Sequence, residues 1–450
     1  MLTDRQGNVV SGGTPEAVRQ YDEALLSFNI YRGDPLAALH AATAEAPAFA
    51  QAHLLEAFIL ALATEPAATA DATAIAERVR QVPLNDREAS QLRILETLLG
   101  GNWVAAATAM DFHNMKYPRD LAALQVGHLL DFYRGSARDL RDRIARALPA
   151  WSADVPGYHV VLGMYAFGLE EAGDYGRAEE TGRRAIDLEP LDCWAHHAVA
   201  HVMEMQGRAE DGIGWMVARE PYWSGDTNFF KVHNWWHRAL CHLDLGQVDE
   251  VWSLYDGPIR GGRSAVALDL VDASALLWRV TLAGHDDGGR WTEVAAAWDA
   301  HADGRLYPFN DVHAVMAYLG AGRDEAIERV RRAQAEAAAE STDVARWIRT
   351  IAQPLITGLV AFARGRYRDA VEALHPVRFV AHQFGGSHAQ RDVIDWTLTE
   401  AAIRAGLREE ALALARERLA LKPHSPINRD FLRRAAETPT PAAGVHEVGV

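Results

Sequence analysis

Histidines spaced for chemistry are concentrated between residues 193 and 246. Six of the nineteen histidines fall in this stretch, and His197/His201 and His233/His237 are each four residues apart. Residues four apart lie on one face of a helix, and the absence of internal Pro and Gly predicts a helix around each pair. Glu204 follows His201 by three residues. Two such helices side by side would place a polar site inside a helical scaffold.

This set of side chains suits two kinds of chemistry. With a metal, His197, His201 and His233 would form a ligand set suited to Zn²⁺ or Fe²⁺. Metalloproteases place Glu directly after the first His, whereas Ala198 follows His197 here, so no established metal fingerprint matches. Without a metal, the group could act as general acids and bases. The candidate catalytic residues are His197, His201, Glu204, His233 and His237. Hydrogen-bonded histidines that only bridge helices are the third interpretation.

The two cysteines lie in the same stretch. Cys193 and Cys241 have histidines nearby and are candidate nucleophiles. A small cysteine within a helix is more often inert packing, so we expect neither to react. Two cysteines also exclude a disulfide framework and are typical of a reducing compartment.

Aromatic and polar residues elsewhere could complete a binding pocket. Trp194 and Trp236 offer large apolar rings beside the histidines. His128 and Asp131 are three residues apart on one predicted helix. Asp311 follows Pro308 and is either a binding residue or a helix cap. For most of the thirteen tryptophans, packing between helices is the simpler interpretation.

The sequence GGSHAQRDV, residues 385–393, places flexible glycines before a helix start. Such a turn can bind an anion, and Arg391 could clamp a carboxylate. An ion pair of Arg391 or Asp392 within or between repeats explains these residues equally well. The candidate ligand-binding residues are Trp194, Trp236, His128, Asp131, Asp311, His388, Arg391 and Asp392.

Glycine turns recur between amphipathic segments along the chain. The step from Gly101 to Gly135 has the same length as the step from Gly173 to Gly207. It matches the period of tetratricopeptide helix pairs, which is roughly 34 residues. The best single unit is 159–192. Longer steps between later glycines indicate degenerate repeats with insertions.

These repeats predict the elements that hold the candidate residues. We expect an all-α, right-handed superhelix (an α-solenoid) with a concave groove over residues 14–436. A flexible N-terminus at 1–13 and a disordered tail at 437–450 should flank it.

The repeat register predicts which side chains face the groove. One period counted from His159 makes Cys193 the first position of a unit, with His196 as a packing residue. The groove positions of that helix are then Trp194, His197, His201 and Glu204. Counting from Gly246 adds His233 and Trp236, and leaves His237 ambiguous.

Several of these blocks also resemble a known family. The segments LGMYAFGLEEAGDYGRAE, CWAHHAVAHVMEMQGR and HNWWHRALCHLDLGQVDEVWSLYD resemble the tetratricopeptide repeat protein 38 family. YPRDLAALQVGHLLDFYRG, PFNDVHAVMAY and GGSHAQRDV look like further blocks of it. The resemblance covers roughly residues 15–435. It implies a fold of degenerate helix-pair repeats and carries no activity.

Composition, charge and the absence of certain motifs argue against several classes of function. A formal charge of −16 and the absence of a dense basic run argue against nucleic-acid binding. The sequence contains neither a GxGxxG turn nor a P-loop, so we expect no nucleotide cofactor. The N-terminal MLTDRQGNVVSGG has no apolar core, and no apolar run could span a bilayer, so we expect a cytoplasmic protein without membrane contact.

Two functions remain open from the sequence. The first is a site in the concave groove that binds a small molecule, with non-redox acid–base or metal-assisted catalysis; a bound divalent metal is one form of it. The second is a scaffold that binds a protein or peptide through the groove, by analogy with other repeat proteins. A capped cavity lined by histidines favours the first and an open trough favours the second. A homo-oligomer is compatible with both.

Overall fold

Helices make up nearly the whole chain. The computed structural model describes residues 1–439, and within them the only other regular pairing is two isolated bridges, Thr3 with Val9 and Arg32 with Asn228. The all-α class expected from the sequence is confirmed. None of the helices in this described part is long and apolar enough to cross a membrane.

The helices follow one another as antiparallel pairs. The first helices of the pairs are α1 (Pro15–Asn29), α3 (Ala50–Leu62), α5 (Asp86–Leu99), α7 (Leu121–Tyr133), α9 (Tyr158–Glu171), α11 (Cys193–Met205), α13 (Lys231–Asp244), α15 (Ala267–Leu282), α17 (Pro308–Gly320), α20 (Gln353–Ala363) and α22 (His388–Arg404). The second helices are α2 (Pro35–Glu45), α4 (Pro66–Val79), α6 (Trp103–Lys116), α8 (Ala137–Ala147), α10 (Tyr175–Leu188), α12 (Ala209–Trp223), α14 (Val248–Leu254), α16 (Trp291–Ala297), α18 (Asp324–Ala337), α21 (Tyr367–Val377) and α23 (Arg408–Leu421). Outside the pairs lie α19 (Asp343–Trp347) and α24 (Pro426–Glu437).

Short 3₁₀ and π turns connect or extend some helices. They are η1 (Leu148–Ala150), η2 (Tyr255–Ile259), η3 (Trp298–Ala300), η4 (Ile348–Ala352) and η5 (Ala381–Phe384). The turn η4 follows α19 and runs directly into α20, so these three elements form one helix with a π-type turn in it. The turn η5 precedes the glycine-rich segment that begins α22, and it helps to form the pocket described below.

Glycines end the first helices, as the sequence predicts. The glycines used to count the repeats have positive φ, including Gly173 at 81° and Gly207 at 68°. This left-handed conformation lets the chain leave one helix and enter the next, and residues with a Cβ rarely adopt it. At Gly135 a Cβ would also collide with the backbone of His382. The unit 159–192 is confirmed as α9 and α10.

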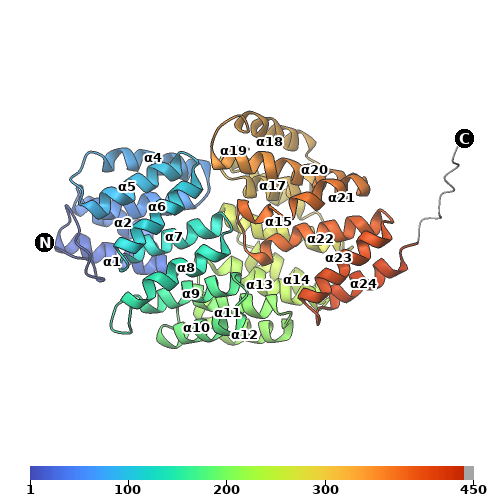
Figure 1. Ribbon diagram of the computed structural model, residues 1–450, viewed down its shortest axis with the longest axis horizontal. Coiled ribbons are helices and arrows are strands. Elements are labelled where there is room, and N and C mark those ends of the chain that lie inside the picture. The colour runs from blue at the N-terminus through green and yellow to red at the C-terminus, as the bar shows by residue number, and fades with distance from the viewer. Residues whose placement is uncertain (440–450) are drawn as a thin grey trace, which may run out of the picture.

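The pairs stack into a right-handed superhelix with the first helices inside. In Figure 1 the chain runs from the N-terminal helices on the left, along α9–α14 below, to α17–α21 above and α22–α24 on the right. The helix α11 shows why these elements form an inner layer, because twelve of its thirteen residues are buried. The partner α10 instead buries four of its fourteen residues and faces solvent with the rest.

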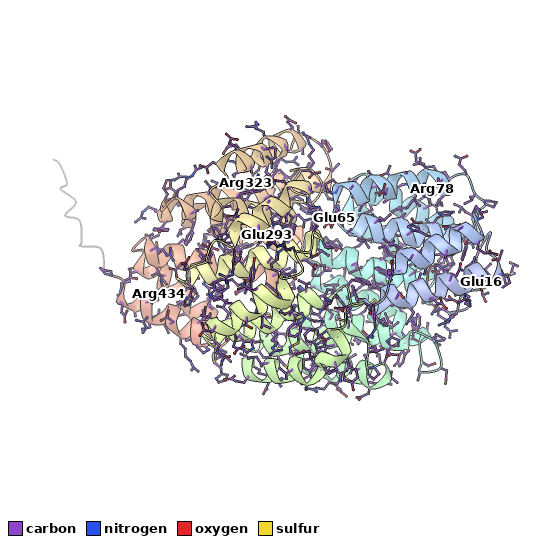
Figure 2. All side chains as sticks on the ribbon, turned by 180° about the vertical axis from the view of Figure 1, so that it is seen from behind. Glu16, Glu65, Arg78, Glu293, Arg323 and Arg434 are labelled. Atoms are coloured by element: carbon purple, nitrogen blue, oxygen red, sulfur yellow. The ribbon has the colours of Figure 1, made fainter. Side chains whose placement is uncertain are left out.

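The inner face is closed by contacts between distant repeats. The Tyr307 hydroxyl donates to the Tyr133 carbonyl oxygen (3.1 Å), and the Asn310 side-chain amide donates to the Thr64 carbonyl oxygen (3.0 Å). The Ala267 backbone N–H donates to the Glu65 carboxylate (2.9 Å), which lies at the border between the N-terminal helices and α15 (Figure 2). The concave side is therefore largely filled by protein.

The N-terminal segment 1–13, which the sequence predicts to be flexible, makes hydrogen bonds to neighbouring elements. The side chain of Gln6 donates to the Pro156 carbonyl oxygen (3.1 Å), and Arg87 donates to the Val9 carbonyl oxygen (3.1 Å). The backbone N–H of Ser11 donates to Glu88 (2.9 Å). Residues 1–13 are thus held against α5 and the loop before α9, because their backbone groups satisfy buried polar side chains. At the other end α24 ends at Glu437, and residues 440–450 of the predicted tail lie outside the described residues.

Candidate functional site

The neighbouring inner helices α11 and α13 position the histidines. The carboxylate of Asp192 accepts from the Ala195 N–H (3.0 Å) and caps the start of α11, which fixes the rotation of the helix. His196 then faces α12 and stacks on Trp215, with ring centroids 5.4 Å apart. His197 and His201 face α13. His196 thus packs on α12, whereas the rings of His197 and His201 contact His237 of α13.

Four histidines converge on one point. One ring nitrogen each from His197, His201, His233 and His237 lies within 4.8 Å of the others. The Nε2 atoms of His237 and His233 are 3.1 Å apart, and those of His237 and His197 are 3.2 Å apart. The rings of His201 and His237 lie 4.3 Å apart. His237, ambiguous from the sequence, is the centre of the cluster.

Two carboxylates fix the tautomers of two of these rings. The Nδ1 atom of His237 lies 2.7 Å from a Glu204 oxygen, and the Nδ1 atom of His233 lies 2.8 Å from an Asp272 oxygen. A carboxylate only accepts hydrogen bonds, so each ring donates from Nδ1 and keeps a lone pair on Nε2. The two Nε2 lone pairs then face each other across 3.1 Å with no proton between them. A cation placed among these nitrogens would remove this repulsion.

Protonation of the rings is a poor source of that cation. Burial, with the charges of neighbouring histidines, holds the pKa of His237 and of His197 well below the usual value. Burial also lowers the pKa of His201 to about 4. His197, His201 and His237 therefore stay neutral near pH 7, which is the form in which imidazole binds metals.

The geometry of the four-histidine cluster, as we call His197, His201, His233 and His237, fits a transition-metal ion. Imidazole suits Zn²⁺, Fe²⁺, Cu²⁺ and Ni²⁺. Two nitrogens that are each about 2.1 Å from one tetrahedral ion lie about 3.4 Å apart, close to the two Nε2–Nε2 distances in the cluster. Ligating histidines commonly donate their other N–H to a carboxylate. His237 with Glu204 and His233 with Asp272 show this pattern.

A second group of acids adjoins the cluster. Neither ring nitrogen of His201 has a hydrogen-bond partner among the described residues, and its Nδ1 lies 3.6 Å from a Glu170 oxygen. Burial raises the pKa of Glu170 well above its usual value, so this carboxyl group is held neutral. Burial alone would also raise the pKa of Glu171, but the charges of His388 and Arg391 offset it and lower it to about 2. Adjacent carboxyl groups thus have different charges, and only Glu170 can donate a proton.

Aromatic rings enclose the cluster. Phe167 lies 5.5 Å from the His197 ring and 5.2 Å from the His201 ring, between centroids. Trp194 lies 5.0 Å from the His197 ring, and Trp236 stacks on His233 at 5.2 Å. These apolar walls exclude water and strengthen electrostatic interactions inside. The two tryptophans expected from the sequence therefore line this site, as part of its wall.

Three other predicted residues lie away from the cluster or only support it. His128 accepts a hydrogen bond from the Trp194 indole (3.2 Å) and so supports the wall. Asp131 forms a buried ion pair with Arg143 (2.7 Å) and has no place in the site. Asp311 accepts from the Gly304 N–H (3.1 Å) and from Gln334, and it stabilises a loop. It does not cap α17, which begins earlier, at Pro308.

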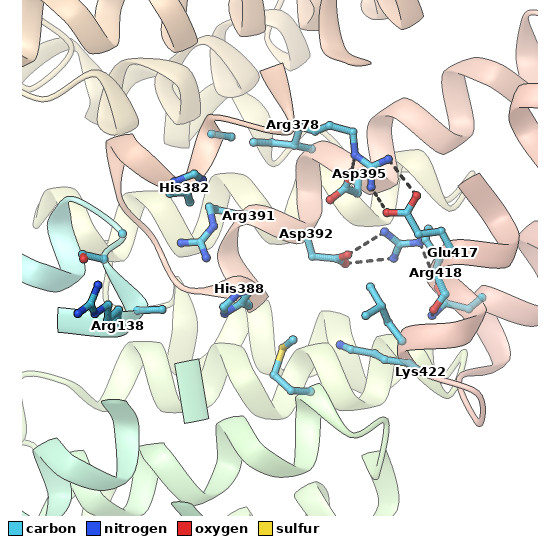
Figure 3. Close-up of a pocket in the computed structure, with 18 residues that line it drawn as sticks. Arg138, Arg378, His382, His388, Arg391, Asp392, Asp395, Glu417, Arg418 and Lys422 are labelled. Atoms are coloured by element: carbon cyan, nitrogen blue, oxygen red, sulfur yellow. Dashed lines mark hydrogen bonds and ion pairs between the residues drawn. The ribbon is translucent and has the colours of Figure 1, made fainter. Parts of the chain in front are cut away.

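Three residues of the GGSHAQRDV segment, His388, Arg391 and Asp392, line a separate pocket next to the cluster (Figure 3). His388 pairs with Glu171 (2.9 Å), and Arg391 approaches the same carboxylate (3.6 Å). Asp392 forms an ion pair with Arg418 (2.7 Å), which joins the two helices of its own pair, α22 and α23. The segment therefore reaches the acids beside His201 rather than the histidines themselves.

The two cysteines are packing residues, as expected. Both are buried, and burial raises the pKa of the Cys193 thiol to about 12. The pKa of the Cys241 thiol is raised by burial as well. Neither forms the thiolate that a nucleophile requires near neutral pH.

Sequence reasoning missed Asp272, Glu170 and Glu171. Asp272 is an acid within the apolar run 267–282, and Glu170 and Glu171 end the apolar run of α9. A carboxylate on the buried face of an apolar helix is costly unless it has a partner. That cost was the available signal, although only the fold shows that the partners are histidines.

Comparisons with known proteins add little to this geometry. No protein-family model matches the chain. Among solved structures, the chain is similar to the crystal structure of the APC/C hetero-tetramer Cut9-Hcn1, with a TM-score of 0.44 and 14% sequence identity. The match covers 94% of this chain and 77% of that chain.

Proposed function

We propose that this protein binds one divalent transition-metal ion through its four-histidine cluster, and that the ion forms the centre of an enclosed small-molecule site. The observation that carries the proposal is the close approach of the His233 and His237 Nε2 atoms, 3.1 Å apart, while the Nδ1 atom of each ring contacts a carboxylate. Their tautomers follow from Asp272 and Glu204. A cluster built only for packing would place a donor opposite each acceptor.

The cluster offers non-redox chemistry to such a site. A metal ion with an open coordination position lowers the pKa of bound water and polarises an oxygen of a ligand. His201, which has no partner in the described chain, is the ring most free to act as a ligand or as a base. Neutral Glu170, 3.6 Å from it, supplies a proton donor at the same edge.

A metal titration tests this proposal. The metal-stripped protein should bind one equivalent of Zn²⁺ or Co²⁺ in competition with a chromogenic chelator, and the Co²⁺ spectrum should report nitrogen ligands in a four- or five-coordinate geometry. The double variant H197A/H237A should lose this binding. His313→Ala is the matched control, because His313 is also a buried histidine but bonds to the Phe309 carbonyl oxygen on α17. Equal binding by wild type and H197A/H237A would contradict the proposal.

Partner binding is the second candidate function. The outer helix α6 exposes Val104, Phe112 and Met115 on one face, with Phe112 69% exposed. An exposed apolar stripe on an outer helix is a common protein contact. The α6 stripe presents only exposed apolar side chains, whereas the inner face brings four histidines together. The metal site is therefore the preferred proposal.

A further inference from the structure

A cavity lies beside the four-histidine cluster. It has a volume of about 540 Å³ and is bounded by the turn before α8, by η5, by α22 and by the α23–α24 connection. This volume lies in the range of small-molecule sites. Figure 3 shows Arg138, His382, His388 and Arg391 around one end of the cavity, and Lys422 extending towards its middle.

The charges on the cavity wall are unbalanced. Five Arg or Lys side chains line it, against three acids. The acids are already bound, since Asp392 pairs with Arg418 (2.7 Å), and Asp395 (2.7 Å) and Glu417 pair with Arg378. Arg138, Arg391 and Lys422 therefore remain without a carboxylate of the cavity itself.

Outside the cavity these three cations have only long contacts to carboxylates, although Arg391 also donates to the backbone carbonyl oxygen of Gly386. Arg391 lies 3.6 Å from Glu171, and Lys422 lies 3.8 Å from Glu204. Both distances exceed that of a good charge-assisted hydrogen bond. Arg138 reaches Asp142 at 3.4 Å and is otherwise exposed. A chain with a formal charge of −16 thus gathers three cationic groups with only long carboxylate contacts around this cavity.

Two contacts join the cavity wall to the histidines. The carboxylate of Glu204 lies between Lys422 and the His237 Nδ1 atom. The carboxylate of Glu171 pairs with His388 of the cavity wall and also lies close to Glu170 and His201. One layer of carboxylates therefore separates the cavity from the cluster.

We propose that this cavity binds a small molecule with at least two negative charges, such as a phosphate ester or a dicarboxylate, and that Arg391 and Lys422 are its principal contacts. The ligand would replace the long contacts of these two side chains with direct charge-assisted hydrogen bonds. Its anionic group would then lie between Arg391 and Lys422, on the cavity side of Glu171 and Glu204. The proposal stands on the cavity and its charges, and it does not depend on a bound metal.

Calorimetry on the full chain at low ionic strength tests the proposal, with inorganic phosphate and succinate as probes. We expect saturable one-site binding of at least one probe, and the stronger probe identifies the ligand class. Arg391→Ala and Lys422→Ala should each weaken binding about tenfold or more. Arg329→Ala is the control, because Arg329 is an exposed partner of Asp299 outside the cavity and should leave binding unchanged.

A second arm separates the cavity from the metal site. After removal of metal with a chelator, anion binding should persist with similar affinity. Loss of binding on metal removal would mean that the anion binds the ion, and it would overturn the proposal while supporting a metal centre. Absence of binding by both probes, or equal affinity of the Arg391→Ala and Lys422→Ala variants and the wild type, would overturn it as well.

Discussion

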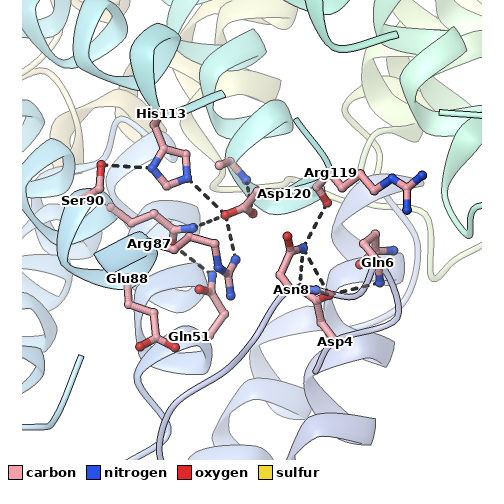
Figure 4. A network of polar contacts seen from close by, with 12 residues as sticks. Asp4, Gln6, Asn8, Gln51, Arg87, Glu88, Ser90, His113, Arg119 and Asp120 are labelled. Atoms are coloured by element: carbon pink, nitrogen blue, oxygen red, sulfur yellow. Dashed lines mark hydrogen bonds and ion pairs between the residues drawn. The ribbon is translucent and has the colours of Figure 1, made fainter. Parts of the chain in front are cut away.

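Two buried clusters of histidine and carboxylate in this molecule differ in whether their histidine ring nitrogens have hydrogen-bond partners. Near the N-terminus, His113 bonds to Ser90 through Nδ1 (3.0 Å) and to Asp120 through Nε2 (3.2 Å), and Arg87 donates to the same Asp120 oxygen (2.7 Å; Figure 4). Both nitrogens of His113 are thus satisfied. In the four-histidine cluster, by contrast, His201 has no partner within the described chain, and two Nε2 lone pairs face each other.

The two clusters also differ in which groups contact their carboxylates. Burial alone would raise the pKa of Asp120, but Arg87 and His113 more than offset it and hold the pKa well below the usual range. That network carries its own cation and also caps α7 through the Ala123 N–H (3.1 Å). In the four-histidine cluster, the supporting carboxylates Glu204 and Asp272 instead contact histidine rings. The first cluster therefore stabilises the fold, and the contrast supports the proposal that the second binds a metal ion.

The largest effect is expected for Asp120→Ala. Removing this carboxylate leaves Arg87 buried without its ion-pair partner, which should cost about 3–5 kcal/mol of the free energy of unfolding. Urea denaturation measures the loss, and Asp369→Ala, which removes an exposed pair with Arg366, should cost about 0.5 kcal/mol or less. Metal content should be unchanged in Asp120→Ala protein that remains folded. A loss of metal there would show that the two clusters are not separate in role.

A smaller loss is expected within the second cluster. In metal-free protein, His201→Ala should cost about 1 kcal/mol or less, because it removes two unsatisfied polar atoms. Leu169→Ala, at a fully buried packing position of α9, should cost about 2–5 kcal/mol. Thermal melts of the two variants compare them. If His201→Ala melts as low as Leu169→Ala, His201 belongs to the structural class of the Asp120 network.

A buried acid outside both clusters, Asp311, should change how stability depends on pH. Burial and the charge of Asp303 raise the pKa of Asp311 to about 7. The folded state then binds this proton more tightly than the unfolded state, so stability should fall as the pH rises from about 4 to about 7 and level off above. Asp311→Asn keeps an acceptor for Gly304 and should remove this fall, with a gain of about 1–2 kcal/mol at pH 8. Parallel pH slopes for the two proteins would contradict the assignment.

The fold and the inward positions could be predicted because they depend on local rules. Helix periodicity and glycine turns predict the helix pairs. The constant step between glycines predicts which residues of α9 and α11 point inward. The same count places His196 in the packing layer and His197 inside. The step from Gly207 to Gly246, before and through α13, is longer than the repeat period. Counting repeat positions from the preceding unit therefore does not show whether His237 points inward.

The rest of the site depends on contacts between distant repeats. Asp272 reaches His233 from α15, and His388 reaches Glu171 across 217 residues of sequence. Such pairings follow from how tightly the superhelix closes, which no local spacing encodes. The same limit explains why the sequence suggests Asp131 and Asp311 as ligands: their partners, Arg143 and Gln334, are visible only in the fold.

Native mass spectrometry with elemental analysis of the purified protein tests the central claim most directly. The account predicts one transition-metal ion per chain in the wild type, and none in the H197A/H237A variant when it is folded as judged by circular dichroism. Asp120→Ala protein, in contrast, should retain its ion. A wild-type chain that carries no metal as purified and takes up none when Zn²⁺, Co²⁺ or Fe²⁺ is added would contradict the account.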